Sequence, residues 1–101
     1  MEKVIENFLE YVVIDTQSLT PSTAKQHELA KLLVKRLEEM GAQEIVYDEE
    51  RCYVYATVPA SAGCEDAPVI GFIAHMDTAP AVTGTGVKPR IIEEYDGQDI
   101  L

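Results

Sequence analysis

VIGFIAHMDT, residues 69–78, is a short uncharged apolar run that leads directly into polar residues. An apolar run of this length after a proline predicts a strand over 69–74 that is buried on both faces. Open α/β sheets bind their ligands beyond the carboxyl ends of their strands. The residues that follow the predicted strand, His75 to Thr78, are therefore the candidate functional site.

The chain before this strand predicts two helices. Apolar side chains recur at helical spacing over residues 2–14 and again over residues 22–40. The second helix has capping-box spacing at Thr23 and Gln26, and Gly41 stands where a C-terminal cap is expected.

Three further segments have the pattern of strands. Residues 44–48 and 52–58 form two short strands around a turn, and another strand is expected at 90–93. The predicted fold class is α/β, with two N-terminal helices packed on a small mixed sheet.

The composition is that of one small globular domain with an excess of acidic residues. The 101 residues include 18 acidic and 8 basic side chains, which give a formal charge of −10. This sign argues against nucleic acid and against an anionic membrane surface as partners. The acidic excess fits either a solubilising surface or an acidic cleft for cations, metals or amino groups.

The cysteines and the N-terminus indicate a reducing compartment. Cys52 and Cys64 form no CxxC pair, which excludes a cysteine-based zinc ribbon and a thioredoxin motif. The amphipathic N-terminus, MEKVIENFLEYV, is unlike a secretion signal, and no apolar run is long enough to cross a bilayer. We therefore expect a cytoplasmic protein.

His75 and Asp77 are the residues best suited to metal chemistry. Histidine is a common metal ligand, and an Asp two positions on faces the same side of an extended backbone, where it orients the imidazole. The alternative is a loop histidine beside an Asp that caps a turn. His27 has no ligand partner at a suitable spacing and is expected to be solvated on its helix. The TGTG stretch, residues 83–86, lacks the third glycine of a dinucleotide loop and is expected to be a flexible or tight turn.

Four segments resemble the peptidase T family: FLEYVVIDTQS, PSTAKQHELAKLLVKRLEEMGAQE, YATVPA and, most specifically, IGFIAHMDTAP. This family is the tripeptide aminopeptidase branch of the zinc metallopeptidases that also include carboxypeptidase G2-like enzymes. The resemblance implies that residues 1–101 are the N-terminal part of a zinc-dependent peptidase catalytic domain. It also implies that the N-terminal residue of a tripeptide is removed by a water bound between two zinc ions, with a Glu as general base.

The resemblance assigns roles to the candidate residues by position. His75 becomes a ligand of one Zn²⁺ ion, and Asp77 becomes the catalytic-site carboxylate that supports it. The other ligands, the general base and an inserted domain follow later in the family's chains. Since a catalytic zinc takes three protein ligands, we expect residues 1–101 alone to bind zinc weakly and to be inactive. The expected partner is a short peptide substrate.

Two alternatives stay open at this point. The chain could be a non-catalytic module that self-associates into a homo-oligomer through an exposed sheet edge. It could also be part of a related zinc peptidase or deacylase, which hydrolysis of tripeptides and of N-acylated amino acids would distinguish.

Overall fold

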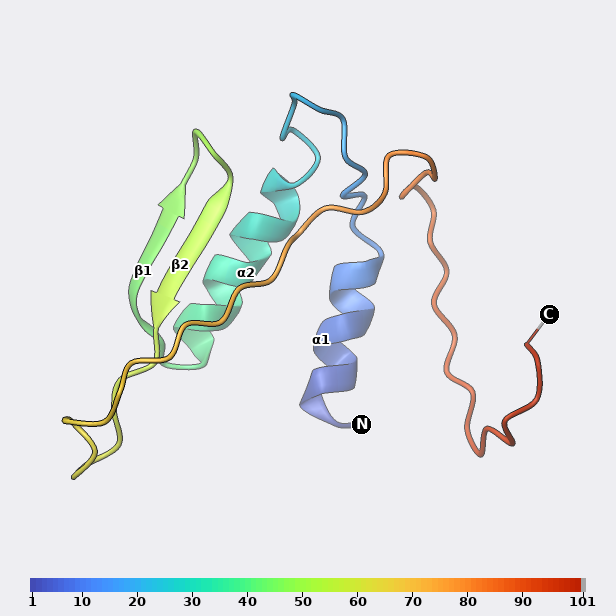
Figure 1. Ribbon diagram of the computed structural model, residues 1–101. Helices are drawn as coiled ribbons and strands as arrows, with labels where there is room; N and C mark the ends of the chain where they lie inside the picture. Colours follow the sequence, from blue (N-terminus) through green and yellow to red (C-terminus); the bar gives the residue numbers. More distant parts are fainter. Residues whose placement is uncertain (101) are drawn as a thin grey trace.

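The computed structural model describes residues 1–100 and contains two helices followed by two strands. The elements are α1 (Lys3–Val12), α2 (His27–Glu39), β1 (Gln43–Asp48) and β2 (Tyr53–Thr57). The two strands pack on α2, and α2 stands between this hairpin and α1 (Figure 1). The arrangement confirms the predicted α/β class, with α2 as the helix that packs on a small sheet.

Helix α1 forms where the apolar period predicted it, but it is shorter at both ends than the expected 2–14. It is joined to α2 by an ion pair between Glu10 and Arg36, whose guanidinium also contacts Glu39 of its own helix at 2.8 Å. Its apolar side chains are poorly covered: Val4 is 68% and Phe8 59% exposed. The ion pair is therefore one of the contacts that hold the helix to the rest of the chain.

Helix α2 begins at His27, five residues later than predicted, because the residues before it form turns. The predicted capping box of Thr23 and Gln26 does not form. The Gln26 side chain does not cap the helix but donates hydrogen bonds to the carbonyl oxygens of Thr16 and Gln17.

The C-terminal end of α2 is as predicted. Gly41 has a φ of 81°, and its N–H donates to the carbonyl oxygen of Glu38 at 3.1 Å. The N–H of Ala42 donates to the carbonyl oxygen of Leu37 at 3.0 Å. This pair of bonds is the Schellman motif, which needs a residue with positive φ and so favours glycine.

Strands β1 and β2 form an antiparallel hairpin, in which Val46 pairs with Tyr55 and Asp48 with Tyr53. The turn between them is held by Asp48, which accepts hydrogen bonds from the Arg51 backbone and from its guanidinium at 3.1 and 3.0 Å. Among residues 1–100, parallel pairing is limited to one isolated bridge between Gln17 and Thr78.

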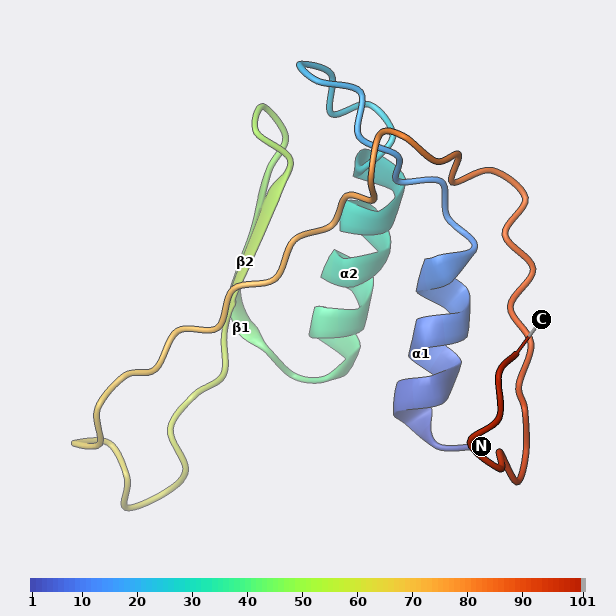
Figure 2. The same ribbon diagram turned by 45° about the vertical axis from the view of Figure 1, so that its right-hand side comes forward.

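The prediction of strands at 69–74 and 90–93 is wrong, because both segments are irregular in the structure. Residues 69–74 run in extended form along the molecule (Figure 2), but among residues 1–100 their backbone hydrogen-bonds to no other segment. Val69 and Ile73 are 100% exposed and Phe72 is 94% exposed, whereas burial on both faces was expected. A strand is stable only beside a partner, and the described residues do not supply one here.

The described part of the chain is open rather than compact. Its radius of gyration is 16.8 Å, whereas a compact domain of this length has about 13 Å. The buried apolar residues of this part are Leu29, Ala30 and Cys52. In place of the single modest core that the composition predicted, the described residues therefore bury only these three apolar side chains. No helix within residues 1–100 has the length and apolar character to cross a membrane.

The two cysteines provide a test of this core. Cys52 is buried, which raises the pKa of its thiol, while Cys64 is exposed. Because the thiolate is the reacting form, we expect a thiol reagent to modify Cys64 at least about tenfold faster than Cys52 in the native chain. Labelling of the Cys64→Ser variant, which leaves Cys52 as the single thiol, measures the slow rate directly. Equal rates under native conditions would show that the hairpin turn that carries Cys52 is not buried.

Candidate active site

His75 and Asp77 lie at the end of the extended segment 69–74, and their side chains meet. The imidazole Nδ1 is 3.0 Å from Asp77 Oδ1. This bond from His75, with a smaller effect of the Ser18 side chain, holds the pKa of Asp77 below its usual value. Because Nδ1 is engaged by the carboxylate, Nε2 is the nitrogen that can bind a metal.

The residue after Asp77 is bound by the segment that connects the two helices. The Thr78 N–H donates to the carbonyl oxygen of Thr16, and the Ser18 N–H donates to the carbonyl oxygen of Thr78, both at 3.0 Å. This is the parallel bridge described above. It fixes the backbone directly beside the His75–Asp77 pair.

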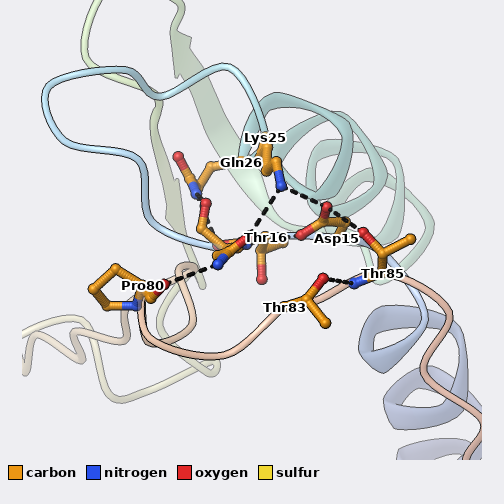
Figure 3. A network of polar contacts seen from close by, with 8 residues as sticks. Asp15, Thr16, Lys25, Gln26, Pro80, Thr83 and Thr85 are labelled. Atoms are coloured by element: carbon orange, nitrogen blue, oxygen red, sulfur yellow. Dashed lines mark hydrogen bonds and ion pairs between the residues drawn. The ribbon is translucent and has the colours of Figure 1, made fainter.

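A network of polar side chains surrounds this bridge (Figure 3). Lys25 Nζ lies 2.8 Å from Asp15 Oδ2 and donates to Gln17 Oε1 at 3.2 Å. Gln17 Nε2 in turn donates to the carbonyl oxygen of Pro80 at 2.9 Å. Asp15 Oδ2 also accepts a hydrogen bond from the Thr85 hydroxyl at 3.1 Å. The hydrogen bonds from Lys25, first, and from the Gln17 backbone hold the pKa of Asp15 below its usual value.

Hollows lie on both sides of the His75–Asp77 segment. One of about 250 Å³ is bounded by the connection before α2, the hairpin turn and residues 74–77. Another of about 540 Å³ lies between α1 and the chain from His75 to Val87. His75 is itself solvent-facing, with 84% of its side chain exposed. The pair is therefore accessible to a ligand from either side.

The described residues fit one ligand position of a metal centre rather than a whole centre. His75 offers a free Nε2, and Asp77 stands where a carboxylate supports a metal-binding imidazole. Within residues 1–100, no group of three or more His, Cys, Asp or Glu side chains is placed to hold a metal ion.

Other sequence-based expectations for this region need correction. His27 is not solvated in mid-helix but is the first residue of α2, half-buried, with its ring against Tyr47 and a 3.1 Å contact to the Thr23 hydroxyl. The TGTG stretch contains the expected turn, at Thr85 and Gly86. The hydroxyl of Thr85 also donates a hydrogen bond to Asp15.

The polar network was not predicted from the sequence. The available signal was the density of hydrogen-bonding side chains in Asp15–Ser18.

Proteins named peptidase T match this chain over its whole length. That of Desulfitobacterium hafniense (strain Y51) is 54% identical over 106 residues, which cover all of this chain and 25% of that protein. That of Alkaliphilus oremlandii is 49% identical over 107 residues, with 100% of this chain and 26% of the relative covered. That of Geobacillus sp. (strain WCH70) is 50% identical over 104 residues, with 98% and 25% covered. The chain is homologous to the N-terminal quarter of peptidase T.

The match to peptidase T includes the whole candidate site, because every residue of this chain lies within the matched part of two of these relatives. The chain spans about a quarter of the length of the curated relatives it matches. No family model matches the chain. The likeness to peptidase T therefore rests on these curated relatives and on the segments quoted above.

The contact between His75 and Asp77 can be tested by titration. In the His75→Ala variant we expect the pKa of Asp77 to rise toward its ordinary value, because the hydrogen bond that favours the carboxylate is gone. NMR titration of the Asp77 carboxyl carbon measures this change, with Asp96, which lies outside the site, as the control. In the native chain this contact stabilises the fold above the unfolded-state pKa and is lost as the pH falls through the folded-state pKa. An unchanged Asp77 titration would show that the two side chains do not meet.

Proposed function

We propose that residues 1–101 are the N-terminal part of the catalytic domain of a dizinc aminopeptidase that removes the N-terminal residue from tripeptides. The observation that carries this proposal is the His75–Asp77 pair, exposed between two hollows in a chain about half identical to proteins named peptidase T. The free cysteines and the acidic composition are compatible with a cytoplasmic enzyme.

His75 would bind a zinc ion through Nε2, and Asp77 would hold the ring in place through Nδ1. When bound, zinc supplies a water of lowered pKa, about 7, and polarises the scissile carbonyl. The acidic character of the chain suits the cationic amino terminus of a peptide. Because a catalytic zinc takes three protein ligands, the remaining ligands would come from the part of peptidase T that this chain does not span.

A chimera tests the proposal. Residues 1–101 replace the matched quarter of the Desulfitobacterium hafniense peptidase T, to which they are 54% identical. We expect the chimera to hydrolyse tripeptides, to lose activity with a chelator and to regain it with Zn²⁺. His75→Ala should lower kcat/KM at least about 100-fold, and Asp77→Asn about 10- to 100-fold, the usual effect of removing the partner of a metal-bound histidine.

The other histidine provides the matched control. His27→Gln removes an imidazole that contacts Tyr47 and should leave kcat/KM within about threefold of the chimera. A folded chimera without tripeptidase activity, beside an active parent enzyme, would contradict the proposal. Faster hydrolysis of N-acylated amino acids than of tripeptides by the full-length form of this protein would instead assign the chain to a deacylase. The 101-residue chain alone should show no hydrolysis and weak zinc binding.

Self-association is a second candidate property, favoured by the exposure of segment 69–74. This segment is apolar, uncharged and extended, and such a segment is a template for pairing with another copy. We expect the sedimentation coefficient of the chain to rise with concentration and the Ile73→Lys variant to stay monomeric. Val58→Lys, which replaces an apolar residue outside the segment that is 86% exposed, should associate like the native chain. A native chain that is monomeric at all concentrations would exclude this property.

A further inference from the structure

The connection between the helices is anchored to the packed part of the molecule through Gln26. This side chain is buried, with 7% of the residue exposed, and its Nε2 donates to the carbonyl oxygens of Thr16 and Gln17 at 2.8 and 3.2 Å. Gln26 directly precedes α2, which packs on the hairpin. The position of the connection is therefore set by the best-packed element of the described chain.

The same connection binds the loop after Asp77 at three points. Thr78 is held by two backbone hydrogen bonds, Pro80 by the Gln17 side chain, and Thr85 by Asp15. Figure 3 shows the contacts of Pro80 and Thr85 from the loop side, and those of Lys25 and Gln26 from the helix side, meeting at the segment that begins at Asp15. The loop is thus fixed along most of its length.

Close packing adds to these bonds at Gly84. A Cβ atom added to this residue would lie 2.5 Å from Asp15 Oδ1 and 3.4 Å from Asp15 Cα. Lys25, which contacts both Asp15 and Gln17, holds the two side chains in the orientations that the loop contacts require. The loop therefore approaches the connection as closely as a glycine allows.

The His75 imidazole depends on this arrangement for its own orientation. Among residues 1–100, its hydrogen-bond partner is Asp77, and Asp77 is the neighbour in sequence of Thr78, which the connection holds. A displacement of Thr78 would move Asp77, and with it the carboxylate that orients the ring. We propose that Gln26, Gln17 and Asp15 are positioning residues, which fix the His75–Asp77 pair relative to the fold through the backbone at Thr78.

The position of the His75–Asp77 pair is inferred from contacts within this chain. The effect of that position on catalysis rests on the proposed function. A substitution remote from the chemistry that misplaces a reacting group by about 1 Å can lower the rate of an enzyme by about 100-fold. A side chain that is 84% exposed is not held by packing, so it needs such support.

The first test uses the 101-residue chain with ¹⁵N labelling, and Gln26→Ala, Gln17→Ala and Gln98→Ala variants. Gln98 is an exposed glutamine remote from the network and is the matched control. We expect Gln26→Ala and Gln17→Ala to speed exchange of the Thr78 amide by about tenfold, the effect of losing roughly one net hydrogen bond. We also expect the ¹⁵N shifts of the His75 ring to move from the Nδ1–H tautomer, which Asp77 favours, toward that of a free imidazole.

The fold is monitored in the same samples by the slow labelling of Cys52. In Gln26→Ala and Gln17→Ala we expect Cys52 to remain slow to label. In the same samples the Thr78 amide should exchange faster and the ¹⁵N shifts of the His75 ring should change. Unchanged exchange and shifts in Gln26→Ala would overturn the proposal. Loss of Cys52 protection in Gln17→Ala would also overturn it, because this residue would then support the whole fold rather than the site.

The second test uses the chimera and separates positioning from binding. Gln17→Ala, Gln26→Ala and Asp15→Asn should lower kcat about 10- to 100-fold, with KM within about threefold of the unsubstituted chimera, and Gln98→Ala should change neither. A rise in KM at constant kcat would contradict a positioning role. If the unsubstituted chimera is inactive, the proposed function fails, while the NMR measurements still decide the positioning of His75 and Asp77.

Discussion

Two backbone hydrogen bonds at Thr78 connect the C-terminal third of the described chain to the helices. The residues before Thr78, from 69 onward, make no backbone hydrogen bond to another segment of residues 1–100. Side-chain hydrogen bonds from Gln17 to Pro80 and from Thr85 to Asp15 add to the bridge in the loop that follows. Since loop closure over this distance along the chain is entropically costly, the bridge and its side-chain bonds act together rather than singly.

The C-terminal third depends on these hydrogen bonds because the described residues bury little apolar surface. Leu29, Ala30 and Cys52 are the buried apolar residues of the described chain, and α1 contributes none of them. Polar residues take over the long-range connections instead: Gln26 joins the helix connection to α2, and Glu10 joins α1 to Arg36. Hydrogen bonds are directional, so they define positions well even where they add little net stability.

The parts of the fold that could be predicted from sequence are those whose causes are local. Gly41 ends α2 because a positive φ is required within its own turn, and the hairpin forms between neighbouring segments. The strand at 69–74 could not be predicted correctly, because its formation depends on a partner rather than on its own apolar pattern. The start of α2 was misplaced for a similar reason, since Gln26 bonds to Thr16, ten residues earlier in the chain.

The same distinction between local and long-range causes applies to the candidate site. His75 and Asp77 were identifiable because two residues at this spacing on an extended chain face the same side, and their contact is present at 3.0 Å. The residues that hold them were not identifiable, because Asp15 and Thr85 are separated by 70 positions and meet only in the fold. An imidazole that must reach a ligand has to stay exposed, and an exposed side chain cannot be fixed by an apolar core. Support from a hydrogen-bonded connection resolves this conflict, because it constrains the backbone beside the site while leaving Nε2 of His75 open.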